Sequence, residues 1–257
     1  MLNIREYPPN LLSKYVANYS IYRFGENIDT QLYPKGIFEI VFQSNTNFQH
    51  NTSYSLGWQS RPKNFIGGLH NKSYTVRTNG KNNFCIAVAF KPNTAKYFIP
   101  YKLHSFRNNI VDILDIWGNG AMELSHKITT EKENINKISL IEDFLLQKLI
   151  QQNTSIIDNA IMIILASKGF VEVGELAKKI GLSNAQFRKR FKEEVGISPS
   201  QYCKIVRINT TLKLFDEGYK KSLIELTYQL GYFDQSHFIK DFKSVTGCSP
   251  KSFKKLN

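Results

Sequence analysis

The chain has 257 residues, of which 42% are hydrophobic and 21% are charged, and its formal net charge at pH 7 is +13. These values are typical of a soluble globular protein with room for two domains. They exclude a membrane-spanning chain, because the longest apolar runs, 84–90 and 160–166, are far too short to cross a bilayer. Three cysteines without a Cys-x-x-Cys spacing, and an N-terminus without an apolar signal core, favour reduced thiols in the cytoplasm over a disulfide framework or a zinc site.

The first part of the chain, to about residue 110, alternates short β-like segments with polar turns rich in Asn and Gly. The segments 37–42 and 84–90 are apolar runs rich in Ile, Val and Phe, which is typical of buried strands. The segment 74–77 alternates like a half-exposed strand. The sequence therefore predicts a β-rich N-terminal region.

Helical periodicity begins near residue 110. Ile138, Ile141, Leu145 and Leu149 recur at three- and four-residue steps, which predicts an amphipathic helix ending near residue 152. Its apolar stripe either packs on its own domain, which we favour, or helps to form a dimer. Because the polar residues 151–155 lack periodicity, we place the boundary there, between domains of residues 1–152 and 153–257.

The C-terminal part contains one supersecondary unit twice. The copies run from Glu175 to Tyr202 and from Glu225 to Phe253, at an offset of 50 residues up to the central glycine and of 51 after it. Capping boxes and Ser-Pro pairs mark the helix starts at Ser183, Ser222, Ser198 and Ser249. The repeat predicts two helix–turn–helix units, at about residues 172–196 and 222–247. Two such units imply a long, periodic ligand such as double-stranded DNA.

The second helix of each copy has an apolar and a polar face. At 100° per residue, Phe187 and Phe191 pack inward in the first copy, and Phe238 and Phe242 in the second. The outward faces carry the residues that we predict to contact DNA, which are Ala185, Arg188, Lys189 and Lys192 in the first copy and Gln235, Ser236, His237, Lys240 and Lys243 in the second. For His237 a capping or packing role is the alternative.

A helix over residues 201–216 joins the copies and would set the distance between them. If the two second helices lie about 34 Å apart, they enter successive major grooves. The positive charge is concentrated here too. Residues 160–257 contain 17 Lys and Arg against 9 Asp and Glu, whereas residues 1–159 contain 17 against 12. A Lys-rich sequence can also reflect an AT-rich genome, but this concentration favours a polyanionic partner.

These residues resemble the DNA-binding domain of the AraC/XylS family of bacterial transcription regulators. The second copy carries the similarity most fully, in Ile224, Leu230-Gly231-Tyr232, Ser236-His237-Phe238, Lys240-Asp241-Phe242-Lys243, Gly247 and Ser249-Pro250. The resemblance implies that the family's base-contacting places fall on Ala185, Arg188 and Lys189, and on Gln235, Ser236, His237 and Lys240. Two positions depart from the family: Thr227 replaces an alanine, and Ala185 a larger side chain.

The N-terminal half resembles the sensor-type domain of one branch of that family. Its motifs are Tyr33-Pro34, Gly36, Glu39-Ile40-Val41-Phe42, Gly67-Gly68 and the segments 87–92 and 111–114. The resemblance implies an α+β protein: a cupin-like β-barrel to about residue 110, helices to 152, and an all-α domain of two helix–turn–helix units joined by a linker helix. Besides DNA it leaves open a small-molecule effector, RNA polymerase and a second copy of the chain as partners, and it implies no cofactor and no membrane.

Other chemistry has little support. The five histidines are widely spaced without nearby carboxylates, so we expect no metal site. Glu39, alone among the acids, lies within an apolar strand and either faces a ligand or pairs with a buried cation; we favour the pairing. A fusion of such a DNA-binding domain with alkyl-transfer repair chemistry would need an activated cysteine, whereas Cys85 lies in an apolar strand where its thiol should be inert.

We therefore predict a sequence-specific DNA-binding transcription regulator and not an enzyme. Non-selective binding of polyanions is the remaining alternative. The first copy offers Arg188 and Lys189, whereas the second offers Gln235, Ser236 and His237 with Lys240. Since these surfaces differ in charge, we expect one chain to recognise an asymmetric DNA site.

Overall fold

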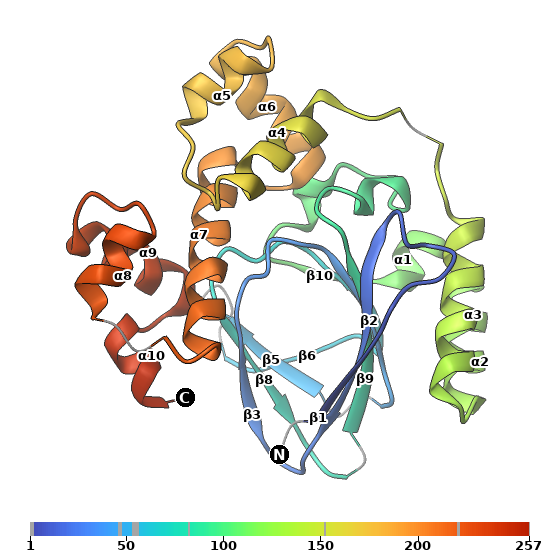
Figure 1. Ribbon diagram of the computed structural model, residues 1–257. Helices are drawn as coiled ribbons and strands as arrows, with labels where there is room; N and C mark the ends of the chain where they lie inside the picture. Colours follow the sequence, from blue (N-terminus) through green and yellow to red (C-terminus); the bar gives the residue numbers. More distant parts are fainter. Residues whose placement is uncertain are drawn as a thin grey trace.

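The computed structural model describes residues 3–45, 48–52, 57–81, 83–151, 153–219 and 222–256. The N-terminal part is built from two antiparallel sheets that face each other as a barrel (Figure 1). The larger sheet contains, in spatial order, β1 (Asn3–Tyr7), β2 (Val16–Phe24), β9 (Asn83–Phe90), β4 (Glu39–Gln43), β7 (Asn64–Gly67) and β10 (Ile110–Asp112). The smaller sheet contains β3 (Asp29–Leu32), β8 (Tyr74–Thr78), β5 (Phe48–Thr52) and β6 (Gln59–Ser60).

The two faces of the larger sheet have different roles because side chains alternate along a strand. Ile40, Ile66 and Val88 point into the main hydrophobic core. Val41 and Phe65, which pair in register on β4 and β7, line the interior of the barrel instead. The predicted strands over 37–42, 74–77 and 84–90 correspond to β4, β8 and β9.

A glycine allows the barrel to meet the segment that follows it. Gly68 lies directly after β7, and a Cβ atom there would overlap the carbonyl oxygen of Phe106 in the short helix η2 (Leu103–Phe106). Any larger residue would push the two backbones apart, so the Gly67-Gly68 motif has a packing reason. The other 3-10 helix of this region is η1 (Ala95–Tyr97).

The helices of the N-terminal part cover the outside of the barrel, with α2 and α3 on the side away from the C-terminal helices (Figure 1). They are α1 (Ile113–Trp117), α2 (Asn119–Thr130) and α3 (Asn134–Gln147). In α3 the stripe Ile138, Ile141 and Leu145 is buried in the main core of its own chain. The stripe is therefore not available for a dimer interface, and packing on its own domain is the alternative that the structure supports.

The C-terminal part is entirely helical in the described residues. It contains α4 (Ile156–Ala166), α5 (Val173–Lys179), α6 (Asn184–Val195), α7 (Pro199–Asp216), α8 (Leu223–Gln229), α9 (Gln235–Thr246) and α10 (Pro250–Leu256). The capping boxes predicted at Ser183 and Ser222 are both formed, and Ser198 caps α7 with Pro199 at its first position. The α+β class, with a β-rich N-terminal region followed by helices, is confirmed.

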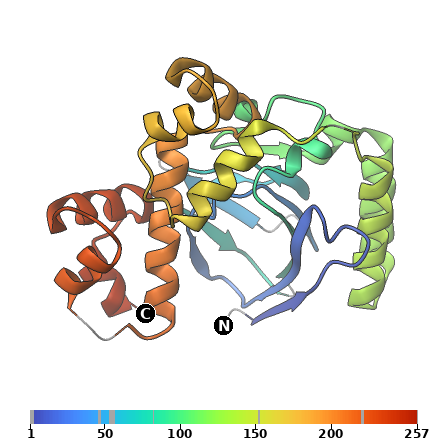
Figure 2. The ribbon, with the colours of Figure 1, turned by 45° about the horizontal axis from the view of Figure 1, so that its top comes forward.

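Helix α7 lies between the barrel and α8–α10 in both Figure 1 and Figure 2. The molecule has two hydrophobic clusters, and the division between them does not coincide with the division of the chain into an N-terminal and a C-terminal part. One joins the barrel strands and the N-terminal helices to α4, α5, α6 and the first half of α7, and the other joins the second half of α7 to α8, α9 and α10. Gln152, where we place the domain boundary, lies outside the described residues, so that boundary stays a prediction.

Candidate nucleic-acid interface

Helix α6, the second helix of the first helix–turn–helix unit, is fixed by its aromatic stripe. Phe187 and Phe191 are fully buried, and their ring centroids lie 5.5 Å apart in an edge-to-face arrangement. The Phe191 ring in turn packs 5.7 Å from Tyr202 of α7. At 100° per residue, the two phenylalanines lie about 200° and 240° around the helix axis from Ala185, which is nearly the opposite side. Since the phenylalanines face the core, the side of α6 that carries Ala185 faces outward. All four predicted residues of this copy, Ala185, Arg188, Lys189 and Lys192, are exposed.

Arg188 has a defined starting position on α6. Its Nε atom donates a hydrogen bond to Oδ1 of Asn184, one turn earlier, at 2.9 Å. A bond between neighbouring exposed side chains costs little to exchange for one with a nucleic acid. Arg188 is therefore oriented along the exposed face and remains available for a new contact.

Helix α9, the second helix of the second unit, is fixed in the same way. Phe238 and Phe242 are fully buried, and their rings lie 5.9 Å apart. Asp234 caps the helix by accepting a hydrogen bond from the backbone N–H of His237 at 2.7 Å. Of the five predicted residues of this copy, Ser236, His237, Lys240 and Lys243 are exposed and Gln235 is half-buried.

A buried carboxylate that the sequence analysis did not single out locks α9 against α7. Asp241 is 3% exposed, and its oxygens lie 2.9 Å from Nζ of Lys204 and 3.2 Å from a guanidinium nitrogen of Arg207. It also accepts a hydrogen bond from the hydroxyl of Tyr232 at 3.3 Å. The two cations of α7 therefore neutralise this acid, and their orientation is set by the protein rather than by a ligand.

Asp241 also constrains His237. The Nε2 atom of His237 lies 3.9 Å from a carboxylate oxygen of Asp241, and its ring packs edge-on against Tyr232 at 5.4 Å between centroids. The side chain is nevertheless 57% exposed. His237 thus packs against Tyr232 and also keeps an edge exposed to solvent.

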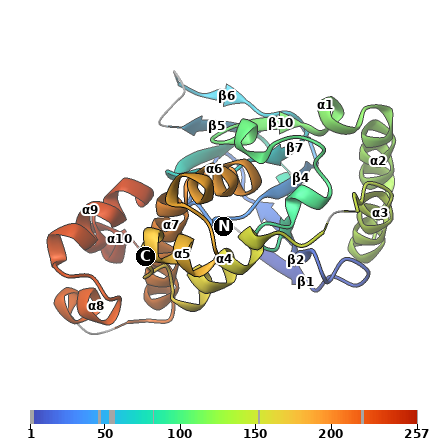
Figure 3. The ribbon, with the colours of Figure 1, turned by 90° about the horizontal axis from the view of Figure 1, so that it is seen from above.

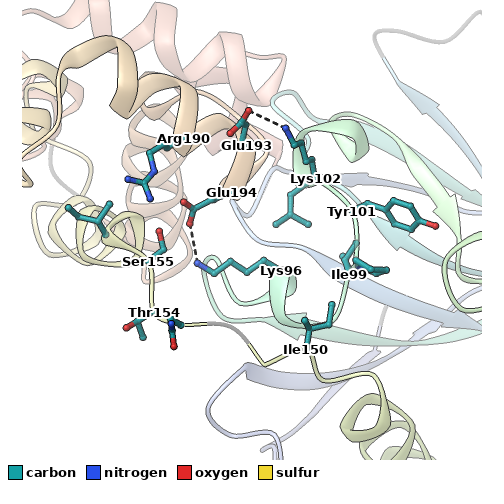
Figure 4. A pocket seen from close by; sticks show the side chains of 14 residues that line it. Lys96, Ile99, Tyr101, Lys102, Ile150, Thr154, Ser155, Arg190, Glu193 and Glu194 are labelled. Carbon is teal, nitrogen blue, oxygen red and sulfur yellow. Dashed lines mark hydrogen bonds and ion pairs between the residues drawn. The ribbon is translucent and has the colours of Figure 1, made fainter.

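The first unit is docked on the barrel by ion pairs. Lys96 of η1, only 10% exposed at its side chain, lies 3.0 Å from Asp158 of α4 and 3.3 Å from Glu194 of α6. Lys102 lies 3.3 Å from Glu193. Figure 4 shows Lys96 facing Glu194 and Lys102 facing Glu193 at a groove of about 690 Å³ between the N-terminal part and α6. The acidic end of α6 is therefore occupied by the barrel, while its basic residues Lys189 and Lys192 stay exposed.

The second unit touches the barrel through the end of α9. The backbone N–H and the hydroxyl of Ser73 donate hydrogen bonds to the carbonyl oxygens of Val245 and Thr246, at 2.8 and 2.9 Å. The last carbonyl groups of a helix lack hydrogen-bond donors within the helix, and here Ser73 of the barrel loop supplies two donors. Seen from above, in Figure 3, α8–α10 extend away from the barrel on the far side of α7.

The interior of the barrel is a cavity of about 470 Å³, called here the barrel cavity. Both sheets and α7 line it, and its wall includes Tyr22, Phe48, Phe65, Val76, Arg61 and Leu212. Glu39 also lies on this wall, where its carboxylate is 2.8 Å from Nζ of Lys35. Glu39 therefore pairs with a lysine, although Lys35 is half exposed and not the buried cation expected from the sequence, and Glu39 also faces the cavity.

Two kinds of site find no support in the described residues. No group of three or more His, Cys, Asp and Glu side chains is placed to hold a metal ion. Burial raises the pKa of the Cys85 thiol to about 12, so this cysteine is not an activated nucleophile. In the same part of the chain, the helices are too short or too polar for one of them to cross a bilayer.

Comparison with known proteins agrees with this geometry. Residues 176–256 match a family described as "Helix-turn-helix domain", and residues 5–112 match a "Domain of unknown function (DUF6597)". The chain is 32% identical over 121 residues to the Msm operon regulatory protein of Streptococcus mutans, covering 46% of this chain and 43% of that protein. It is 32% identical over 130 residues to the probable transcriptional regulator LumQ of Photobacterium leiognathi, covering 51% of each.

A solved structure shows a similar fold over nearly the whole chain. ToxT from Vibrio cholerae superposes with a TM-score of 0.53 at 12% identity, covering 93% of this chain and 97% of that one. The fold and the two exposed second helices define a protein in which a β-rich domain is followed, in chain order, by a double helix–turn–helix DNA-binding domain. Residues 176–256 belong to the helix–turn–helix family that they match, and the relatives that share up to half of the chain are named as regulators of transcription or of an operon. It spans about half the length of the curated relatives that it matches.

Proposed function

We propose that this protein is a transcription regulator that binds an asymmetric double-stranded DNA site, with α6 in one major groove and α9 in the next. The observation that carries the proposal is that both second helices present outward faces that are free of the protein core and differ in charge. Arg188, Lys189 and Lys192 are exposed on α6, whereas Ser236, His237 and Lys240 are exposed on α9. An arginine can bind guanine bidentately, and phosphate contacts by lysine fix the register.

Non-selective binding of polyanions is the alternative to test. The experiment is a titration of fluorescently labelled duplex with protein at several salt concentrations, using a duplex selected for binding and a scrambled duplex of equal length and composition. We expect both affinities to fall with salt, because counterions are released, but the selected duplex to keep its preference at every salt concentration. Equal affinity for both duplexes throughout would leave only the charge-driven alternative.

We further propose that the N-terminal domain modulates DNA binding by accepting an effector in the barrel cavity. The cavity has the size of small-molecule sites, and α7 forms part of its wall through Asn209, Leu212 and Asp216. One structure of ToxT, with a TM-score of 0.51 at 10% identity, was solved bound to (E)-4-(8-methylnaphthalen-1-yl)but-3-enoic acid. An effector here would contact both domains of this chain at once.

The other expected properties stay proposals. We infer a cytoplasmic protein without enzymatic activity, in line with relatives that are named as regulators. RNA polymerase and a second copy of the chain remain candidate partners. A dimer would have to use a surface other than the stripe of α3, since Ile141 and Leu145 are fully buried within the chain.

A further inference from the structure

The barrel cavity contains a buried arginine without an acidic partner. Arg61 lines the cavity and is 9% exposed. All 21 Asp and Glu residues lie in the part of the chain that the structure describes, and none forms an ion pair with Arg61. Its guanidinium lies over the rings of Phe65 at 4.5 Å and Tyr74 at 5.9 Å, and its Nε atom has no hydrogen-bond partner.

One acid on the cavity wall, Glu39, is already paired. Glu39 forms its ion pair with Lys35 at 2.8 Å, and Lys35 also donates a hydrogen bond to the hydroxyl of Tyr22 at 3.3 Å. Contact with aromatic rings offsets part of the cost of burying Arg61, but it leaves the positive charge uncompensated. Among the described side chains, nothing neutralises this cation.

The neighbours of Arg61 reflect an electropositive interior. Burial, together with the smaller effects of the positive charges of Arg61 and His50, lowers the pKa of His70 to about 4. Burial and Arg61 likewise lower the pKa of His50. Both imidazoles are therefore neutral near pH 7. Lys35 and Arg61 are the Lys and Arg side chains among the described residues that line the barrel cavity, and of these two Arg61 lacks an acidic partner.

The rest of the cavity wall indicates the body of the ligand. Phe24, Val41, Phe48 and Val76 present apolar surface from both sheets. The planar guanidinium has two parallel N–H donors that match the two oxygens of a carboxylate. Resting on the function proposed above, we propose that the barrel cavity binds a small organic carboxylate with an apolar body, whose carboxylate pairs with Arg61.

The charges on the wall also set the orientation of this ligand. Asp216 and Asn209 line the side of the cavity that α7 forms, and Glu39 lies on β4. A carboxylate placed beside Asp216 would meet a like charge, so the acid group points to Arg61 and the apolar body contacts Leu212 and the remainder of α7. The ligand therefore contacts α7, and α7 is the helix against which the second unit packs.

The test compares acids with their uncharged amides. Octanoate and phenylbutanoate, with octanamide and phenylbutanamide as matched neutral probes, are titrated into the full-length protein by calorimetry, and the thermal unfolding midpoint is recorded alongside. We expect the acids to bind and to raise the midpoint, and each amide to bind at least about tenfold more weakly. Arg61→Met should remove the difference within each acid–amide pair.

Arg77→Met is the control variant. Arg77 lies on β8 of the same barrel, but it pairs with Asp29 at 2.7 Å and does not line the cavity. This variant should bind the acids as the wild type does. If Arg61→Met does not fold by circular dichroism, Arg61→Lys keeps the charge without the bidentate geometry, and it should weaken the acids several-fold while leaving the amides unchanged.

Three results would overturn the proposal: equal affinity of acid and amide, acid binding that Arg61→Met leaves intact, or no binding across a series of linear and phenyl-substituted acids of increasing length. DNA binding is measured on the same samples. Selective DNA binding without acid binding would refute this ligand and leave the regulator standing. Acid binding without DNA selectivity would do the reverse.

Discussion

At the residue scale, the proposed DNA contacts depend on single side chains of α6 and α9. We expect Arg188→Ala and Lys240→Ala each to relax the base preference at one position of the site, at a cost of about 1–3 kcal/mol in binding free energy. Both side chains are exposed and make no contact with the core, so the fold should not change. The measurement is the affinity of each variant for duplexes with every base in turn at each position.

Lys127→Ala is the matched control, because Lys127 is exposed on α2, away from the C-terminal helices. It should leave both affinity and preference unchanged. A uniform loss of affinity on all duplexes for Arg188→Ala and Lys240→Ala would show that these residues contact phosphates and not bases.

His70 gives the protein a dependence of stability on pH. Its pKa is about 4 in the folded protein, mainly because of burial, against about 6.5 when unfolded. Since the unfolded chain binds the proton more readily between these values, stability falls as pH decreases from 6.5 to 4, by up to about 3 kcal/mol. His70→Gln should remove about one proton from the pH dependence of the unfolding free energy in urea.

His126→Gln serves as the comparison, since His126 is exposed on α2. An unchanged pH slope for His70→Gln, or an equal change for His126→Gln, would contradict the assignment. His50, whose pKa is lowered in the same direction, should keep part of the slope in the His70 variant.

At the element scale, the docking of α6 on the barrel rests on Lys96. Replacing it by Met leaves the carboxylates of Asp158 and Glu194 facing each other with only partial exposure. We expect Lys96→Met to lower the free energy of unfolding by about 1–3 kcal/mol and to speed amide hydrogen exchange in α6. Urea unfolding followed by tryptophan fluorescence measures the first effect, and hydrogen exchange the second.

Lys102→Met is the milder counterpart, because Lys102 is 68% exposed and pairs only with Glu193. It should change stability by less than about 1 kcal/mol. Equal effects of the two substitutions would mean that the groove in Figure 4 is held by packing and not by the buried lysine.

Local patterns in the sequence predict many of the helices and strands, but they predict none of the ion pairs between residues that are far apart in the chain. The apolar run 84–90, the capping box at Ser183 and the repeated glycines predict β9 and both helix–turn–helix units because their causes lie within a few residues. The partners of Lys96 and Asp241 lie on other elements, so no spacing announces them. Arg61 shows the same limit, since its isolation depends on where every acid of the chain ends up.

At the scale of the whole molecule, the two units are held differently. The first shares a continuous hydrophobic core with the barrel, whereas the second has its own cluster with the end of α7. The barrel touches the second unit through a few contacts, including those of Ser73 with α9. Helix α7 is therefore the element through which events in the barrel cavity can reach the second unit.

In the proposed function, one chain has two unlike DNA-binding surfaces, and α7 sets the distance between them. A random pool of duplexes, enriched through rounds of binding to the purified protein, tests this directly. We expect two half-sites of different sequence, with centres separated by about 10 base pairs, one helical turn. Recovery of two identical half-sites, of a single short site, or of no enriched sequence would contradict it.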